Sequence, residues 1–155
     1  MLEGPRRGPG SRALLFDRLF DLDLRQVEEA QPRRVLRRGQ VVDSIRRELL
    51  RLLNTRCAET VERLGDEVRT VVNYGLPDFI TLSPGSERDR QRLARLIADA
   101  IRAYEPRLRN PVVVASAEPG RPGVLAIGVD GMLVIDNLAE PVSFPLVIEI
   151  GRAHV

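Results

Sequence analysis

The hydrophobic pattern of this sequence changes at Pro106, which divides the chain into two parts. Before Pro106, apolar residues recur at steps of three and four, which is the spacing of an amphipathic helix. After Pro106, they form β-branched runs bounded by glycine and proline, which are typical of strands. Because helices come first and strands follow, the pattern predicts an α+β fold with N-terminal helices followed by a small antiparallel sheet of three to four strands.

Two helices are clearly marked in the first part of the chain. The first is predicted over about residues 41–56, where one face is apolar and the other charged. The second follows an N-cap at Ser86 and ends near Glu105, because the next residue is proline and disfavours helical geometry before it. Between them we expect a short helix around residues 58–64 and a loop over residues 71–80.

Three apolar runs predict the strands, at residues 112–114, 124–135 and 142–150. The second run contains Asp130-Gly131, which favours either a hairpin turn or a bulge within one long strand. The third run contains Pro145, which favours an edge position or a bulge.

The N-terminal region differs in composition from the rest. Residues 1–12 are rich in glycine, proline and arginine and are predicted to be disordered, so we expect a single domain over residues 13–155. The segment Ala13–Phe20 is short and amphipathic, and such a helix must dock on another surface to be stable. No apolar run approaches the length of a membrane span, so we expect a cytoplasmic protein without direct membrane insertion.

Composition excludes several kinds of site. All 24 basic residues are arginine, so no lysine is present for a phosphate-binding loop, a Schiff base or a general base. The only histidine is His154 and the only cysteine is Cys57, which cannot build the common zinc sites. With 4% aromatic residues and a net charge of +2, the chain has little material for binding nucleic acid. We predict no catalytic residues, no cofactor, no metal and no nucleic-acid partner.

Three short stretches combine residues that the helices and strands alone do not require. They are residues 52–56 (Leu-Leu-Asn-Thr-Arg), 74–78 (Tyr-Gly-Leu-Pro-Asp) and 104–108 (Tyr-Glu-Pro-Arg-Leu), and residues 14–19 (Leu-Leu-Phe-Asp-Arg-Leu) add a fourth. In this order and spacing they resemble the TssE family, the baseplate wedge subunits of bacterial type VI secretion systems, within the wider phage tail-baseplate family labelled "lysozyme-like". The resemblance covers roughly residues 13–150.

The resemblance implies a structural, non-enzymatic role. It implies a baseplate component that binds other wedge subunits and gives the contractile sheath its docking platform, at the inner face of the cell envelope. The implied fold is similar to the strand-exchanging "handshake" domain of sheath proteins. The implied partner-binding residues are Leu15, Phe16, Arg18 and Leu19 near the N-terminus, Tyr74, Leu76 and Asp78 in the loop, and Glu105, Pro106, Arg107 and Leu108 after the second helix.

Each stretch also has a purely structural interpretation. Residues 54–56 can cap the C-terminal end of the first helix, and residues 74–78 can form a rigid turn over packed Tyr74 and Leu76. Residues 104–108 can form a helix stop with an intramolecular Glu-Arg pair. The closing run, residues 142–150, carries only one charge and is either a buried strand or an edge that accepts a partner strand.

Other functions are also compatible with these features. One alternative is the wedge protein of a phage-like contractile particle, and another is a small adaptor with the same fold. A glycan hydrolase is a more remote alternative and would need Asp78 and Glu105 as its paired carboxylates. Pairing of Glu105 with Arg107 is unfavourable for a general acid, and the chain lacks the tryptophans that often line sugar clefts.

Overall fold

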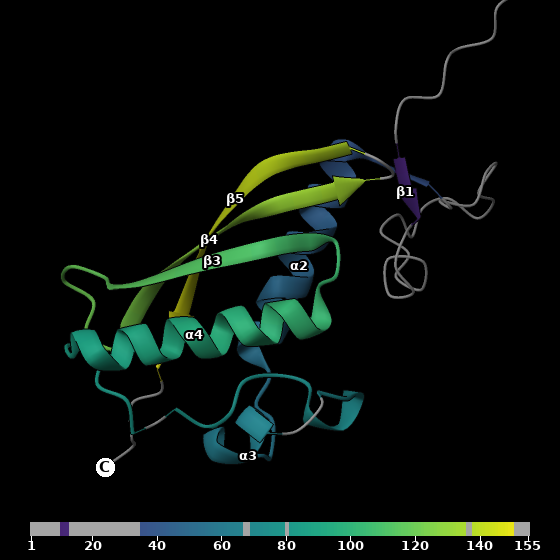
Figure 1. Ribbon diagram of the computed structural model, residues 1–155. Coiled ribbons are helices and arrows are strands. Elements are labelled where there is room, and N and C mark those ends of the chain that lie inside the picture. Colours follow the sequence, from purple (N-terminus) through teal and green to yellow (C-terminus); the bar gives the residue numbers. More distant parts are fainter. Residues whose placement is uncertain (1–9, 13–34, 67–68, 80, 136–137, 151–155) are drawn as a thin grey trace, which may run out of the picture.

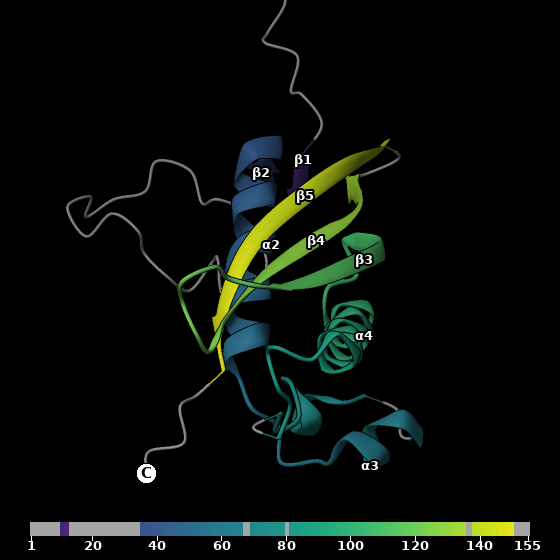
Figure 2. The same ribbon diagram turned by 90° about the vertical axis from the view of Figure 1, so that its left-hand side faces the viewer.

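The chain forms two layers, with two helices packed on one face of a three-stranded sheet (Figures 1 and 2). The computed structural model describes residues 10–12, 35–66, 69–79, 81–135 and 138–150. The main helices are α2 (Arg38–Asn54) and α4 (Glu87–Tyr104). The sheet consists of β3 (Leu108–Ala117), β4 (Val124–Ile135) and β5 (Leu138–Glu149). This confirms the predicted α+β fold class.

Both predicted helices are present, and local chemistry sets their ends. At the start of α2, the Gln40 side chain accepts a hydrogen bond from the backbone N–H of Arg37 at 2.9 Å. At the start of α4, the Ser86 hydroxyl accepts from the backbone N–H of Asp89 at 3.3 Å, which confirms the predicted N-cap. The last turn of α4 closes with the Glu105 N–H donating to the Ile101 carbonyl at 2.8 Å.

Two short elements connect α2 to α4. Helix α3 (Val61–Asp66) lies slightly later than the short helix predicted around residues 58–64. The predicted loop over residues 71–80 begins with a single 3₁₀ turn, η1 (Val71–Asn73). This turn is closed by a capping box in which the Asn73 side chain accepts from the Thr70 N–H at 2.6 Å.

The sheet is a simple antiparallel meander in the order β3-β4-β5. β4 pairs with β5 without interruption, from Val124 opposite Glu149 to Ile135 opposite Leu138. The hairpin interpretation of Asp130-Gly131 is therefore wrong. β5 lies at one edge of the sheet, which confirms the edge position that its proline favoured.

The irregularity in the sheet lies in β3, opposite Gly131. The register shifts between Arg109 and Val112, so β3 carries one extra residue there. Asn110 in this bulge has φ 50, the left-handed region in which asparagine is favoured over most residues. Gly131 leaves room for the buried Leu108, because a Cβ at residue 131 would lie 2.7 Å from Leu108 Cδ1.

A small two-stranded sheet precedes α2, with β1 (Gly10–Arg12) paired to β2 (Val35–Arg37). The last three residues of the predicted disordered segment 1–12 are therefore in a strand. Residues 13–34 lie outside the described part of the chain, and with them the amphipathic segment that contains Leu15, Phe16, Arg18 and Leu19. A single domain over residues 13–155 stays a prediction.

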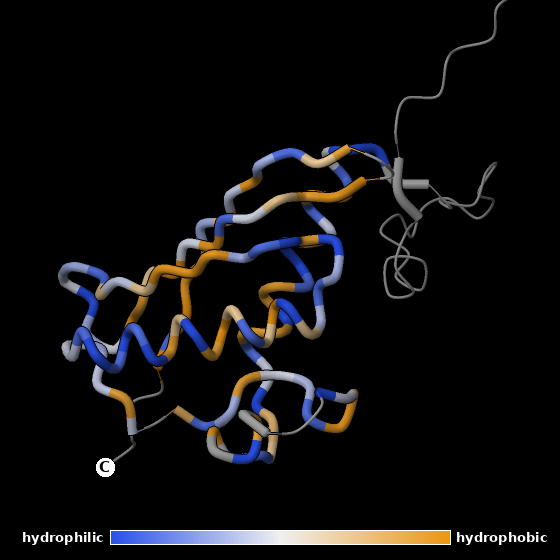
Figure 3. Tube along the Cα trace, viewed as in Figure 1, coloured by the Kyte–Doolittle hydropathy of each residue, from blue (hydrophilic) through white to orange (hydrophobic). Residues whose placement is uncertain are grey.

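The core lies between the helices and one face of the sheet. Figure 3 shows hydrophobic residues recurring along α4 about once per turn and colouring much of the strands. Fully buried side chains come from both layers, including Ile45 and Leu49 of α2, Ile97 and Ile101 of α4, and Phe144 of β5. None of the described helices is long and apolar enough to cross a membrane.

The close packing at Gly131 can be tested with a matched glycine on the same strand. We expect Gly131→Ala to lower the free energy of unfolding by about 1–3 kcal/mol, because the new methyl group overpacks Leu108. Gly128→Ala is the control, since a Cβ there meets no heavy atom within 4 Å. We expect it to change stability by less than about 1 kcal/mol. Urea unfolding of both variants measures the difference, and equal effects would contradict this account of the bulge.

Candidate functional site

Three of the stretches singled out in the sequence are brought together in the structure. We call residues 54–56, 74–78 and 104–108 the motif cluster. The first two are joined through their backbones as an isolated parallel bridge between Arg56 and Leu76. The Leu76 N–H donates to the Thr55 carbonyl at 2.9 Å, and the Cys57 N–H donates to the Leu76 carbonyl at 2.9 Å. The chain that leaves α2 is thereby fixed to the loop that precedes α4.

Gly75 makes this close backbone approach possible. Its φ is +111°, a conformation that residues with a Cβ rarely adopt. A Cβ at residue 75 would also lie 2.5 Å from the Thr55 carbonyl oxygen, well inside van der Waals contact. The glycine in the Tyr-Gly-Leu-Pro-Asp stretch is therefore required by the bridge to residue 55.

Residues 54–56 cap the C-terminal end of α2. The side chains of Asn54, Thr55 and Arg56 donate hydrogen bonds to the carbonyls of Leu50, Arg51 and Leu53 at 2.8, 2.7 and 3.0 Å. The carbonyls of Arg51 and Leu53 are among the last four of α2, which a helix end leaves without an intrahelical partner, and Leu50 is one residue earlier. The structural interpretation of this stretch is confirmed.

Arg56 makes a further contact within the cluster region. Its guanidinium group lies 4.0 Å from the centroid of the Phe79 ring, in cation–π geometry. Burial lowers the pKa of Arg56 from its ordinary value, and the nearby Asp78 carboxylate opposes this shift. The guanidinium therefore links the end of α2 to the segment after the bridge.

Two tyrosines join the loop to the end of α4. The rings of Tyr74 and Tyr104 are in edge-to-face contact, with centroids 5.0 Å apart. The Tyr104 hydroxyl lies 2.8 Å from the Thr70 carbonyl and 2.9 Å from the Asn73 carbonyl, so it anchors both ends of η1. Burial is the main cause that raises the pKa of Tyr74 and the pKa of Tyr104, which favours the neutral phenol that can donate.

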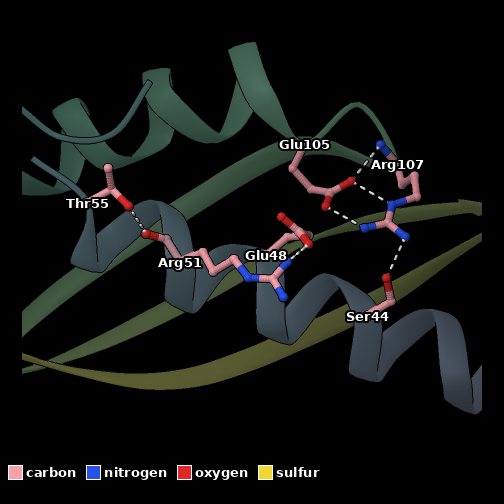
Figure 4. Close-up of polar contacts among 6 residues, drawn as sticks. All are labelled: Ser44, Glu48, Arg51, Thr55, Glu105 and Arg107. Atoms are coloured by element: carbon pink, nitrogen blue, oxygen red, sulfur yellow. Dashed lines mark hydrogen bonds and ion pairs between the residues drawn. The ribbon is translucent and has the colours of Figure 1, made fainter. Parts of the chain in front are cut away.

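The third stretch contains a buried ion pair at the junction of α4 and β3 (Figure 4). Arg107 binds both carboxylate oxygens of Glu105, with Nε 2.8 Å from Oε1 and Nη2 2.7 Å from Oε2. Its Nη1 donates to the hydroxyl of Ser44 on α2 at 3.0 Å. Glu105 is only 3% exposed and Ser44 is completely buried. We call these three residues the Glu105–Arg107 lock.

The lock is the intramolecular arrangement that the sequence allowed as one interpretation. It connects the junction of α4 and β3, which follow each other in the sequence, to Ser44 of α2, which lies 63 residues before Arg107 (Figure 4). The bidentate geometry uses the planar fork of arginine, which a lysine ammonium group cannot reproduce. The lock therefore sets the position of both helices relative to the sheet.

The predicted partner-binding residues differ widely in exposure. Leu76, Glu105 and Leu108 are buried within this chain, and Tyr74 and Arg107 are partly covered. Pro106 and Asp78 are exposed. Partner binding by any of them stays a prediction, and the burial of the first three argues for a role in positioning the surface rather than forming it.

Ser44 is a residue of this site to which sequence reasoning assigned no role in binding or positioning. It lies on the core-facing side of α2, next to the buried Ile45 and three residues after the buried Val41. A serine on an otherwise apolar helix face is a signal that a polar partner is buried opposite it.

The cluster contains no arrangement that favours hydrolysis. Both oxygens of Glu105 are engaged by Arg107, so this carboxyl is poorly suited to be the general acid of a glycan hydrolase. A pocket of about 390 Å³ opens nearby, lined by residues 57–61, 78–79 and 81–82 together with Arg92 and Leu96. Within the described ranges, no group of three His, Cys, Asp or Glu side chains is placed to hold a metal ion.

Comparison with known proteins finds a family and a solved structure that this chain resembles. Residues 40–138, more than half of the chain, match the family model described as baseplate wedge protein gp25. This span includes all but the first two residues of α2, together with α4, β3, β4 and the whole motif cluster. A chain of the solved structure titled "The baseplate complex from the type VI secretion system" is 22% identical, with a TM-score of 0.51, over 72% of this chain and 96% of that chain. At this identity the likeness shows a shared fold. No curated protein matches the sequence.

The energetic coupling within the lock can be measured with a double-mutant cycle. We expect Glu105→Ala and Arg107→Ala each to cost about 3–5 kcal/mol of unfolding free energy, because each leaves a buried charge without its partner. The double variant should cost little more than one single variant, since no unpaired charge remains. The exposed Asp99–Arg102 pair on α4 is the control, and breaking it should cost at most about 1 kcal/mol. Strict additivity at the lock would contradict the coupling.

A second pair of glycines tests the bridge between residues 55 and 76. We expect Gly75→Ala to cost about 3 kcal/mol, because it combines a strained positive φ with a clash against Thr55. Gly120→Ala is the control, since φ there is also positive (+74°) but no heavy atom lies within 4 Å of the added Cβ. It should cost about 1 kcal/mol. Thermal and urea unfolding compare the two, and similar losses would mean that the close approach is unimportant.

Proposed function

This chain belongs to the family of baseplate wedge protein gp25, and we propose that it is the wedge subunit of a type VI secretion baseplate. Membership of this family makes the chain a structural baseplate component that interacts with other baseplate subunits. The family match carries the proposal, because it spans both main helices, two strands and all of the motif cluster.

Two observations support the secretion system over other contractile machines. The four stretches named in the sequence resemble those of the TssE family in their order and spacing. The chain also shares its fold with a chain of a type VI baseplate complex, over nearly the whole length of that chain. The protein would then work in the cytoplasm, in a baseplate docked at the inner face of the cell envelope. The second candidate, the wedge protein of a phage-like particle, shares the family match.

We propose that the motif cluster acts as an internal frame for the binding surface. Its contacts are made within the chain: a backbone bridge, a helix cap, a tyrosine pair and the Glu105–Arg107 lock. The exposed Pro106 and Asp78 lie on this frame and are the members most available to a neighbouring wedge subunit. Leu15, Phe16, Arg18 and Leu19 would add a second contact with the wedge, and the assembled subunit would support the first layer of sheath. No enzymatic activity is proposed.

The proposal can be tested in the native host with a tagged copy of the chain replacing the natural one. We expect affinity purification to recover the other wedge subunits and the sheath protein of the same secretion system. Deletion of the chain should abolish sheath assembly, visible as the loss of filaments formed by a fluorescent sheath protein. Recovery of tail proteins from particles released into the medium would instead favour the phage-like particle, and recovery of neither set would contradict a baseplate role.

The role of the motif cluster is tested in the same experiment with the Glu105→Ala/Arg107→Ala double variant. We expect the variant to recover at least tenfold less of the wedge subunits, because the lock positions the binding surface. The Asp99→Ala/Arg102→Ala variant is the matched control and should bind like the natural protein. Circular dichroism must show that both variants are folded. Normal binding by a folded lock variant would limit the lock to stability.

A further inference from the structure

The side of α4 that faces away from the core carries a row of arginines. Since an α-helix has 3.6 residues per turn, the buried Leu93, Ile97 and Ile101 lie together on one side of this helix. The opposite side is formed by exposed residues, which we call the arginine face: Arg88, Gln91, Arg92, Arg95, Asp99 and Arg102. At 1.5 Å per residue this face is about 21 Å long.

The positive charge of the arginine face is only partly balanced within the chain. The face contains four arginines and one aspartate. Arg102 forms an ion pair with Asp99 at 2.6 Å, and both side chains are 57% exposed. Neither Arg88 nor Arg95 has an ion pair with another described residue. The face therefore presents unneutralised guanidinium groups to the solvent.

Local helix chemistry opposes this arrangement. Arg88 lies in the first turn of α4, where the helix dipole favours acidic residues such as its neighbours Glu87 and Asp89. Arg88 is also four residues before Arg92, and like charges at this spacing destabilise a helix. Natural sequences keep locally unfavourable residues mainly where function requires them. An anionic partner would turn these unfavourable charges into favourable contacts.

The composition of the arginine face indicates which anionic partner fits it. A second helix with carboxylates at steps of three and four residues would meet arginines at the same steps, like the charged flanking positions of paired helices. Asp99 interrupts the row and would repel a uniformly anionic polymer or lipid surface. Among the described residues, the exposed large hydrophobic side chains do not include any from α4. The helix therefore offers no apolar side chain for insertion into a membrane.

The arginine face borders the motif cluster. The pocket of about 390 Å³ is lined by Asp78 of the cluster and by Arg92 of α4. Asp78 is one of the exposed members of the cluster. A subunit that contacts Asp78 would therefore lie next to the arginine face.

From these observations we propose that the arginine face of α4 binds an acidic helix of a protein partner. The inference rests on the proposed function, which places this partner among the other baseplate wedge subunits. It adds a contact made by residues outside the four stretches of the sequence. The contact is made by side-chain charges, so reversing one of these charges should weaken it without disturbing the core.

Two charge reversals at matched positions test the proposal by affinity purification of the tagged full chain from the native host. Arg95→Glu changes the middle of the arginine face, and Arg46→Glu makes the same change in the middle of α2. Both arginines are exposed, and neither has an ion pair with a described residue. We expect Arg95→Glu to recover at least tenfold less of the wedge subunits, and Arg46→Glu to differ from the natural protein by less than twofold.

A third variant separates binding from folding. Arg88→Glu places a favourable charge in the first turn of α4 and relieves the repulsion of Arg92. We expect its melting temperature to be at least that of the natural protein, while its recovery of the wedge subunits falls at least fivefold. A lower melting temperature with the same loss of binding would make Arg88 a structural residue and overturn its place in the docking face.

A photo-crosslinking residue at Gln91 identifies the partner directly, because Gln91 lies between Arg88 and Arg95 on the arginine face. We expect mass spectrometry to find the cross-link in a wedge subunit, in a segment with Asp or Glu at steps of three and four residues. Cross-links to phospholipid, to nucleic acid or to a segment without this pattern would overturn the proposal.

The outcomes separate this inference from the function on which it rests. Normal recovery of the wedge subunits by the Arg95→Glu variant would overturn the docking face and leave the baseplate role intact. Failure of the natural protein to recover any wedge subunit would overturn both.

Discussion

The arrangement of the two layers depends on the buried ion pair between Glu105 and Arg107. A carboxylate at 3% exposure is tolerated only with a partner that meets both of its oxygens, and the arginine two residues later does so with its planar fork. Because Arg107 also donates to Ser44, the same group holds α2 against the junction of α4 and β3. The contacts of Arg107 therefore fix three things together: the end of α4, the start of β3 and the position of α2 against both.

Elements governed by local chemistry could be predicted from the sequence. The N-cap at Ser86, the end of α4 before Pro106 and the apolar face of α2 follow from periodicity and capping within a few residues. The connection at Asp130-Gly131 could not be predicted in this way. Locally it has the signature of a hairpin turn, but pairing along the whole of β5 keeps β4 a single continuous strand. The space left by Gly131 is used by Leu108, a residue 23 positions earlier in the chain.

In the candidate site, too, local features could be predicted from the sequence and contacts between distant segments could not. The three stretches could be recognised individually, yet nothing within them indicates that they touch each other. Their contact requires a backbone approach at Gly75 and the hydroxyl of Ser44, both of which depend on the packing of distant elements. Leu76 and Leu108 belong to these stretches and yet are buried in the core, so membership of a stretch does not identify a surface residue. The type of a residue alone does not show whether its side chain contacts a partner or only supports the residues that do.

The two prolines of β5 have a consequence for how copies of this chain behave at high concentration. A subunit needs two competent margins to act as a link in a growing fibre, because each link must pair with the one before and the one after. The Ile150 N–H donates to the Gly123 carbonyl and the register with β4 continues without a shift, so the odd-numbered Pro141 and Pro145 lie at backbone positions that face away from β4. Because proline has no N–H to donate there, β5 is a poor acceptor for edge-to-edge pairing between copies. Pairing between copies is therefore opposed at one of the two margins of this sheet, which disfavours growth of a fibre that needs both.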